Sequence, residues 1–132
     1  MILNKKQLDK IKKAIPDYQC FIVGSSTIKN VISNDVDVLV LIDKPITRKE
    51  LKEIRKNFYK ICPREEYSLL FNWAKDNEKI KKTFPYYDLK TDDYKYADKD
   101  KMTIGEYEIL KMKLFNTRIK TNRFFKERKQ YG

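Results

Sequence analysis

Residues 21–42 read FIVGSSTIKNVISNDVDVLVLI and decide the fold more than any other stretch of the chain. An apolar run typical of a β-strand ends at Gly24 and Ser25, and two aspartates, Asp35 and Asp37, open a second apolar run. Side chains two residues apart in a strand point to the same face. We therefore expect both carboxylates to be directed at one point near the Gly-Ser turn, an arrangement suited to a magnesium–triphosphate site.

The composition predicts one folded domain, residues 1–132, without a membrane partner. Hydrophobic residues make up 41% and aromatic residues 13% of the chain, which is enough for a modest core. No apolar run approaches the roughly 18 residues of a transmembrane helix, and residues 1–6 do not begin a signal peptide. We expect a cytoplasmic protein, or a viral or phage protein that acts in the host cytoplasm.

The chain contains no histidine, and this excludes several classes of chemistry. Ser-His and Cys-His nucleophile pairs, histidine-ligated zinc and imidazole bases are all ruled out. The two cysteines, Cys20 and Cys62, lie in apolar contexts and are expected to be reduced and structural. Acid–base or metal chemistry must therefore use carboxylates, tyrosines or lysines.

The net charge of +11 makes this a basic protein, and two interpretations of it stay open. One is the lysine-rich composition that an AT-rich genome produces. The other is a phosphate-rich partner such as nucleic acid, which lysines and arginines bind by releasing counterions. Basic residues concentrate in 44–64 and 111–129, whereas acidic residues gather between Asp88 and Asp100. This clustering favours the phosphate-rich partner.

Hydrophobic periodicity predicts an α/β (α+β) fold, a mixed β-sheet flanked by helices and followed by a C-terminal helix. The core is expected over about 18–91 and the last helix, which begins at a capping box of the form Thr-x-x-Glu, over about 103–128. Strands are predicted over 20–23, 36–42, 67–72 and 84–91, and earlier helices over 4–15 and 47–62. The remaining segments are predicted as a short helix or turn (26–33), a short helix or excursion (73–83) and a charged loop (92–101).

The aspartates and the Gly-Ser turn are each weak signals, but together they predict a nucleotide site. Most Gly-Ser pairs are simply turns, and most Asp-x-Asp pairs are solvated strand ends. Here the aspartates lead into the apolar run 36–42, where two carboxylates repel each other and are costly to desolvate unless a cation lies between them. Gly24 lets the backbone approach a phosphate, and Ser25 and Ser26 add hydroxyl groups.

The pattern Gly24-Ser25-x9-Asp35-x-Asp37 resembles the signature of the DNA polymerase β superfamily of nucleotidyltransferases. Its spacing is most similar to that of the family X DNA polymerases, and kanamycin nucleotidyltransferase and the minimal nucleotidyltransferase antitoxins have similar signatures. The resemblance covers residues 21–42, and the order of strands and helices extends it to about residue 91. It implies a nucleotidyltransferase-like mixed sheet. It also implies transfer of a nucleoside monophosphate from an NTP or dNTP, ATP included, to an acceptor hydroxyl.

The resemblance also implies roles for individual residues. Asp35 and Asp37 match the ligands of two Mg²⁺ ions, for which Mn²⁺ can substitute, and Gly24 and Ser25 match the turn that holds the triphosphate. Ser26 follows the matched turn. At the position where many relatives carry an arginine and a second glycine, this chain has neither, and Lys29 supplies a single positive charge.

A third carboxylate on a later strand completes the site in the family. Asp88 is our first choice, because it lies between apolar residues of a predicted strand. Asp92 and Asp93 come second, because they fall in a predicted loop. The catalytic and metal-binding set expected from the resemblance is therefore Asp35, Asp37 and Asp88.

Three functions stay open at this point. The first is a nucleotidyltransferase whose partners are a nucleoside triphosphate and a nucleic-acid 3′ hydroxyl. The second is nucleotidylation of a protein or a small molecule, as in the antitoxin-like relatives. The third is a catalytically inactive nucleic-acid-binding module on the same fold, which the missing arginine and glycine favour.

Overall fold

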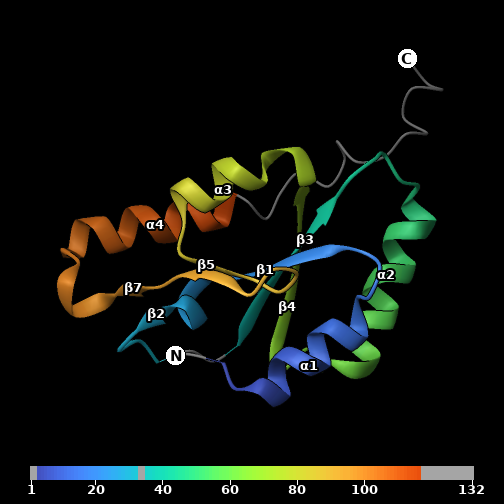
Figure 1. Ribbon diagram of the computed structural model, residues 1–132, viewed down its shortest axis with the longest axis horizontal. Coiled ribbons are helices and arrows are strands. Elements are labelled where there is room, and N and C mark those ends of the chain that lie inside the picture. Colours follow the sequence, from blue (N-terminus) through green and yellow to red (C-terminus); the bar gives the residue numbers. More distant parts are fainter. Residues whose placement is uncertain (1–2, 33–34, 117–132) are drawn as a thin grey trace.

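The computed structural model describes residues 3–32 and 35–116 (Figure 1). The helices are α1 (Lys5–Ala14), α2 (Arg48–Ile61), α3 (Asn77–Thr83) and α4 (Ile104–Asn116). The strands are β1 (Gln19–Val23), β2 (Ile28–Lys29), β3 (Val36–Ile42), β4 (Tyr67–Trp73), β5 (Tyr86–Asp88), β6 (Asp93–Lys95) and β7 (Ala97–Asp98). Single turns of 3₁₀ helix occupy Gly24–Thr27, Ala74–Asp76 and Lys99–Lys101. The predicted mixture of helices and a mixed sheet is confirmed.

Five strands form the main sheet in the order β4-β3-β1-β5-β6. Strands β3 and β4 run parallel, connected through α2, and every other neighbouring pair in this sheet is antiparallel. Strand β3 is flanked on both sides, as its continuous apolar sequence predicts, and all but one of its residues are buried. Strands β2 and β7 form a separate parallel pair.

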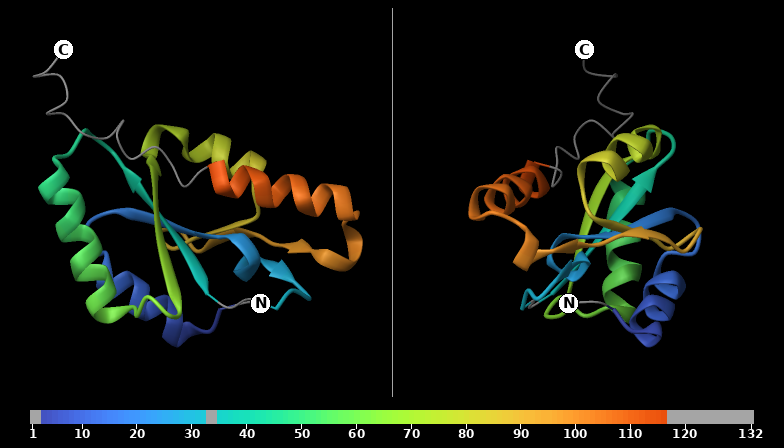
Figure 2. Two further views of the ribbon diagram at one scale, coloured as in Figure 1. Left: turned by 180° about the vertical axis from the view of Figure 1, so that it is seen from behind. Right: turned by 60° about the vertical axis from the view of Figure 1, so that its left-hand side comes forward.

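Helices cover both faces of this sheet (Figures 1 and 2). On one face, α1 and α2 pack over a core that includes Ile11, Phe58, Val38 and Phe71. On the other face, α3 and α4 contribute Ile80 and Leu110 to a second core around Phe21, Leu39 and Leu41. Because side chains alternate along a strand, the odd-numbered residues of β1 and β3 belong to the second face. Asp37 therefore shares its face with α3 and α4.

Local sequence accounts for the ends of the longer helices. Both residues of a capping box are engaged at α1 (Asn4 and Gln7) and at α2 (Thr47 and Glu50). The predicted capping box before α4 is also present, since Thr103 accepts from the backbone of Glu106 and the Glu106 side chain accepts from Thr103. Among the described residues, no helix has the length and apolar composition needed to cross a membrane.

Three predicted segments differ from the structure, and one prediction extends beyond the described residues. The strand predicted over 84–91 is limited to Tyr86–Asp88, because the chain turns after Asp88, where the Asp92 N–H donates to the Asp88 carbonyl. The segment predicted as a short helix or turn over 26–33 is a 3₁₀ turn that begins earlier, at Gly24, and leads into β2. The charged loop predicted over 92–101 contains β6 and β7. Strands this short carry no readable periodicity, and they form only because β5 and β2 offer partners. Residues 117–128 of the predicted last helix lie outside the described residues.

Candidate functional site

Gly24 and Asp37 are in direct contact. Gly24 follows β1 and opens the 3₁₀ turn with a φ of +77°, a left-handed conformation that favours glycine. A Cβ atom added to Gly24 would overlap Oδ2 of Asp37 and lie 3.3 Å from its Cγ. Glycine is therefore required here twice, for the backbone conformation and for the space that the Asp37 carboxylate occupies.

Asp35 directly precedes β3, and Asp37 is the second residue of that strand. The main-chain register places Asp37 opposite Val23 of β1 and opposite Ser68 of β4. The Ser68 hydroxyl donates a hydrogen bond of 2.6 Å to Oδ2 of Asp35. Both aspartates are half-buried. The register includes Asp37 but not Asp35, so convergence of the two carboxylates stays a prediction. Strand β4 supplies the hydroxyl that binds Asp35.

The turn Gly24–Thr27 is held by its own side chains. The Thr27 hydroxyl donates a hydrogen bond of 2.7 Å to the carbonyl of Gly24, which closes the turn beneath Asp37. Ser25 is half-buried, whereas Ser26 is 2% exposed, and its Oγ has no hydrogen-bond partner among the described residues. A buried hydroxyl in this position is costly unless a ligand or water satisfies it.

Lys29 lies apart from this turn. Its neighbour Ile28 is 2% exposed and packs into the core beneath α3 and α4. Side chains alternate along a strand, so the exposed Lys29 is directed to the opposite side of β2. Its register partner in β7 is Asp98. The structure therefore gives no contact that supports the predicted role of Lys29 at the triphosphate.

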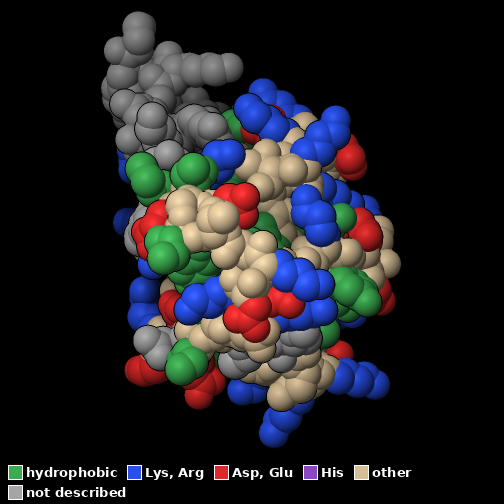
Figure 3. Space-filling model, turned by 90° about the vertical axis from the view of Figure 1, so that its left-hand side faces the viewer, with side chains coloured by type: hydrophobic (Ala, Val, Ile, Leu, Met, Phe, Trp, Pro, Cys, Tyr) green, Lys and Arg blue, Asp and Glu red, His purple; other side chains and the backbone are tan. Residues whose placement is uncertain are grey.

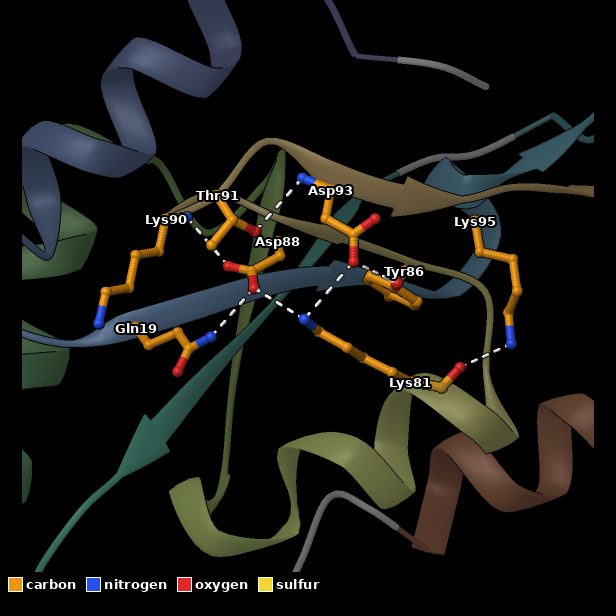
Figure 4. A network of polar contacts seen from close by, with 8 residues as sticks. All are labelled: Gln19, Lys81, Tyr86, Asp88, Lys90, Thr91, Asp93 and Lys95. Carbon is orange, nitrogen blue, oxygen red and sulfur yellow. Dashed lines mark hydrogen bonds and ion pairs between the residues drawn. The ribbon is translucent and has the colours of Figure 1, made fainter.

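Asp88 is completely buried and is the centre of a different polar network (Figure 4). Its Oδ2 accepts a hydrogen bond of 3.0 Å from the Gln19 side chain and lies 3.2 Å from the ammonium nitrogen of Lys81. Its Oδ1 accepts from the backbone N–H of Lys90 at 3.0 Å. This carboxylate has the ionic and hydrogen-bonding partners that burial of a charge demands.

The Lys81 side chain reaches this network from α3. Its ammonium also lies 3.5 Å from Asp93 and over the rings of Phe21 and Tyr86, at 5.6 and 5.5 Å from their centroids. Burial by itself would lower the pKa of Lys81, but the hydrogen bond and charge of Asp88 outweigh it and raise the pKa. Lys81 is thus held in its charged form against Asp88.

Asp92 and Asp93, the second choices for a third carboxylate, belong to the hairpin between β5 and β6. Asp93 lies opposite Asp88 and accepts a hydrogen bond of 2.6 Å from Tyr86, which is the main reason its pKa is lowered. Asp92 is exposed and accepts a hydrogen bond of 2.6 Å from Tyr87. That hydrogen bond, followed by burial, raises the pKa of Tyr87 to about 12.

The register separates Asp88 from the aspartate pair. Asp37 is opposite Val23, whereas Asp88 is opposite Phe21, on the other side of β1. Two strand spacings amount to about 10 Å and two residues along a strand to about 7 Å. Within residues 3–32 and 35–116, no three acidic or cysteine side chains gather closely enough to hold a metal ion. The structure therefore brings Gly24 and Asp37 together, places Asp35 beside Ser68, and leaves Asp88 in its own network.

Ser68 and Lys81 are among the network residues that the sequence analysis missed. Ser68 contacts Asp35 only because β4 pairs with β3 in a particular register, although a polar residue near the start of an apolar strand is a weak signal. Lys81 gave no signal, since it is one of several lysines in a polar segment. Both cysteines are free and buried, as predicted.

The arrangement at Asp37 offers two hard carboxylate ligands beside a tight backbone turn. Such a donor set suits Mg²⁺, which prefers oxygen ligands and is often held by one or two carboxylates together with substrate phosphates. Comparison of the chain with protein-family models and with curated proteins finds no match. The function is therefore inferred from the geometry of the site and from the resemblance of residues 21–42 to the nucleotidyltransferase signature.

Proposed function

We propose that the protein is a metal-dependent nucleotidyltransferase in which Asp35 and Asp37 hold a divalent cation and Gly24–Thr27 lies along the triphosphate. One observation carries the proposal. The Asp37 carboxylate lies against Gly24, although the two residues are distant in sequence, so the acidic pair and the glycine turn form one site. A glycine that was merely a turn residue would not need to leave this space for an acidic side chain.

The roles of the chain's own residues follow from their contacts. Ser68 fixes the orientation of the Asp35 carboxylate through its 2.6 Å hydrogen bond. Gly24 keeps the backbone close to Asp37, and the buried Ser26 hydroxyl has no hydrogen-bond partner among the described residues. When bound, a divalent cation would offset the repulsion between the carboxylates and neutralise charge on the phosphates.

The proposed site uses two carboxylates from this chain. Mg²⁺ accepts a ligand set completed by phosphate oxygens and water, so Asp35 and Asp37 suffice for one ion. The resemblance implies a second ion held with a third carboxylate. Asp88 is paired with Lys81, and we therefore leave it out of the proposed site.

The acceptor is a hydroxyl group, and a nucleic-acid 3′ end is our first choice because the chain is strongly basic. A protein hydroxyl or a small molecule is the alternative. The test incubates the protein with labelled ribo- and deoxyribonucleoside triphosphates and Mg²⁺ or Mn²⁺. The acceptors are primer–template DNA, single-stranded RNA, tRNA and the protein itself.

The decisive variants are Asp37→Asn and Asp43→Asn. Asp43 follows β3 directly at its other end and is exposed, so its replacement removes the same charge without touching the proposed site. We expect Asp37→Asn to abolish label transfer and Mg²⁺-dependent triphosphate binding, while Asp43→Asn retains both. Undiminished transfer by a folded Asp37→Asn variant would exclude the proposed site.

A second candidate is a nucleotide-binding module without turnover. The observation that favours it is the Asp88–Lys81 pair. Asp88 is our first choice for the third metal-binding carboxylate, and it is already paired with the ammonium group of Lys81. Such a module would bind Mg²⁺–triphosphate through Asp35 and Asp37 but give no labelled product with any acceptor in the panel. The same experiment therefore separates the two candidates.

A further inference from the structure

Helices α1 and α2 form a strongly basic layer. They pack side by side on the face of the sheet opposite to Asp37 (Figures 1 and 2). Helix α1 has five lysines against one aspartate, and α2 has six basic residues against two glutamates. Each helix therefore has a net charge of +4, and the layer has a net charge of +8, compared with +11 for the whole chain.

The charges of this layer face solvent. Ten of its eleven basic residues are exposed, and Lys10 is half-buried. In α2, Lys49, Lys52, Lys56 and Lys60 follow the three- and four-residue spacing that aligns side chains along one side of a helix. Lysines brought this close repel one another, so a surface of this kind is stabilised by a partner that brings negative charge.

The opposite end of the molecule shows that the lysines are not spread evenly. Residues 93–113 contain five basic and five acidic residues and therefore have no net charge. Figure 3 looks onto the end that carries β7 and α4, and there Lys and Arg side chains are intermixed with acidic and apolar ones. Among the described residues, the net positive charge is therefore concentrated on the α1–α2 layer, whereas β6, β7 and α4 carry none.

The chemistry of the α1–α2 surface favours a nucleic-acid backbone over a protein or a membrane. The exposed large hydrophobic side chains of the described residues lie in other segments, at Ile32, Tyr94, Ile104, Ile109 and Met112. Protein interfaces have a desolvated core rich in aromatic side chains, and interfacial helices insert apolar side chains into the bilayer. A phosphodiester backbone needs only positive charge, which releases its counterions.

We propose that the outer surface of α1 and α2 binds the phosphodiester backbone of a nucleic acid, independently of the site at Asp35 and Asp37. The sheet separates the two surfaces, so a strand held on the helices leaves the aspartate face open. This proposal does not rest on nucleotidyl transfer. Binding at the helices requires no divalent cation and no nucleotide.

The test compares two charge-reversal variants of the full chain with the same change in net charge. The first replaces Lys6, Lys49, Lys52 and Lys56 with glutamate on the α1–α2 surface. The control replaces Lys79, Lys82, Lys101 and Lys113, all of them exposed, with glutamate outside that surface. A third variant with glutamine at the four helix positions provides the measurement if the reversal impairs folding, which circular dichroism reports.

Binding is measured in EDTA by fluorescence anisotropy with a labelled single-stranded oligonucleotide and a duplex, over a series of salt concentrations. For the single strand, we expect the α1–α2 variant to raise Kd at least about 10-fold and to reduce the salt slope by about 3, since each lost phosphate contact removes about 0.7. The control should change Kd less than about 3-fold. An Asp35→Asn/Asp37→Asn variant should bind as the unaltered protein does, even if transfer is lost or never detected.

Three outcomes would overturn the proposal. If the α1–α2 variant and the control weakened oligonucleotide binding equally, binding would depend on net charge and not on a defined surface. Failure of the unaltered protein to bind either oligonucleotide at low salt would exclude a nucleic acid as the partner of this surface. Binding to vesicles that contain phosphatidylserine, without binding to oligonucleotides, would assign the surface to a membrane.

Discussion

Two acidic groups on the same face of one sheet have opposite surroundings. Asp88 is fully buried, and Lys81, Gln19 and a backbone N–H of the same protein surround its carboxylate. Asp35 and Asp37 are half-buried, beside the hydroxyl of Ser68 and the backbone of Gly24. The Asp88 carboxylate is paired with a cation of the protein itself, the Lys81 ammonium group. The Asp35 and Asp37 carboxylates instead present oxygen ligands at a tight turn. Burial and neighbours, rather than residue type, distinguish a structural carboxylate from a candidate ligand.

The largest effect is expected where the internal cation is removed. Lys81→Met leaves the Asp88 carboxylate buried with its charge uncompensated, so we expect the free energy of unfolding to fall by about 3 kcal/mol. Adding Asp88→Asn removes that charge and should restore a large part of the loss. Urea unfolding measures both variants.

Lys82→Met is the matched control, because Lys82 is the exposed neighbour of Lys81 on α3. It should change stability by less than about 0.5 kcal/mol. If the effects of Lys81→Met and Asp88→Asn were simply additive, the two side chains would not form the unit that the 3.2 Å contact indicates.

The next effect concerns the turn at the aspartate pair. Gly24→Ala combines a positive φ with an overlap of its Cβ and Asp37, so we expect a loss of about 1–3 kcal/mol in stability. Displacement of Asp37 should also weaken Mg²⁺–triphosphate binding. Thermal unfolding and a nucleotide-binding titration measure the two effects.

Gly105→Ala provides the comparison within the same chain. Gly105 lies in α4, where an added Cβ meets only the Thr103 hydroxyl at 3.9 Å. Alanine is a better helix former, so stability should stay the same or rise by up to about 1 kcal/mol. An equal loss of stability in Gly24→Ala and Gly105→Ala would show that the contact of Gly24 with Asp37 does not add to the cost of the substitution.

A smaller effect is expected at Ser68. Ser68→Ala removes the hydrogen bond to Asp35 and should cost about 1 kcal/mol in stability. Because Asp35 loses its orientation, Mn²⁺-dependent triphosphate binding should weaken several-fold. Ser68→Thr keeps a hydroxyl and should recover much of the binding, which a role in packing alone would not predict.

The smallest effect concerns the hairpin beside Asp88, at high pH. The hydrogen bond from Tyr87 to Asp92 raises the pKa of Tyr87 from 10.0 to about 12. A raised pKa in the folded state means that this stabilisation is complete below pH 10 and is lost as the pH rises towards 12. The stability difference between the unaltered protein and Tyr87→Phe should therefore shrink over that interval.

Tyrosinate absorbance provides a direct check of this assignment. Tyr87→Phe should remove one ionisation near pH 12 from the titration curve, and Asp92→Asn should shift that ionisation towards pH 10. A titration curve unchanged by Asp92→Asn would separate Tyr87 from Asp92 and leave the raised pKa without its main cause.

Much of the fold could be predicted because the signals are local. The capping residues Asn4, Thr47 and Thr103 and the apolar run of β3 each fix an element within its own segment. Strands β6 and β7 could not be predicted, because each is very short and exists only through pairing, β6 with β5 in a hairpin and β7 with the distant β2. The site residues divide in the same way. The spacing of residues along the chain identifies Gly24 and Asp37, whereas Ser68 and Lys81 reach their partners only through tertiary contacts.

The sequence by itself determined that an Asp-x-Asp pair would open a buried strand after a glycine turn, and that no histidine could take part. Only the tertiary structure decided which carboxylates meet. Strand order and register place β1 between Asp37 and Asp88, and α3 brings Lys81 to Asp88. The physical reason is that alternation within a strand is a local property, whereas contacts between strands depend on pairing across the whole sheet.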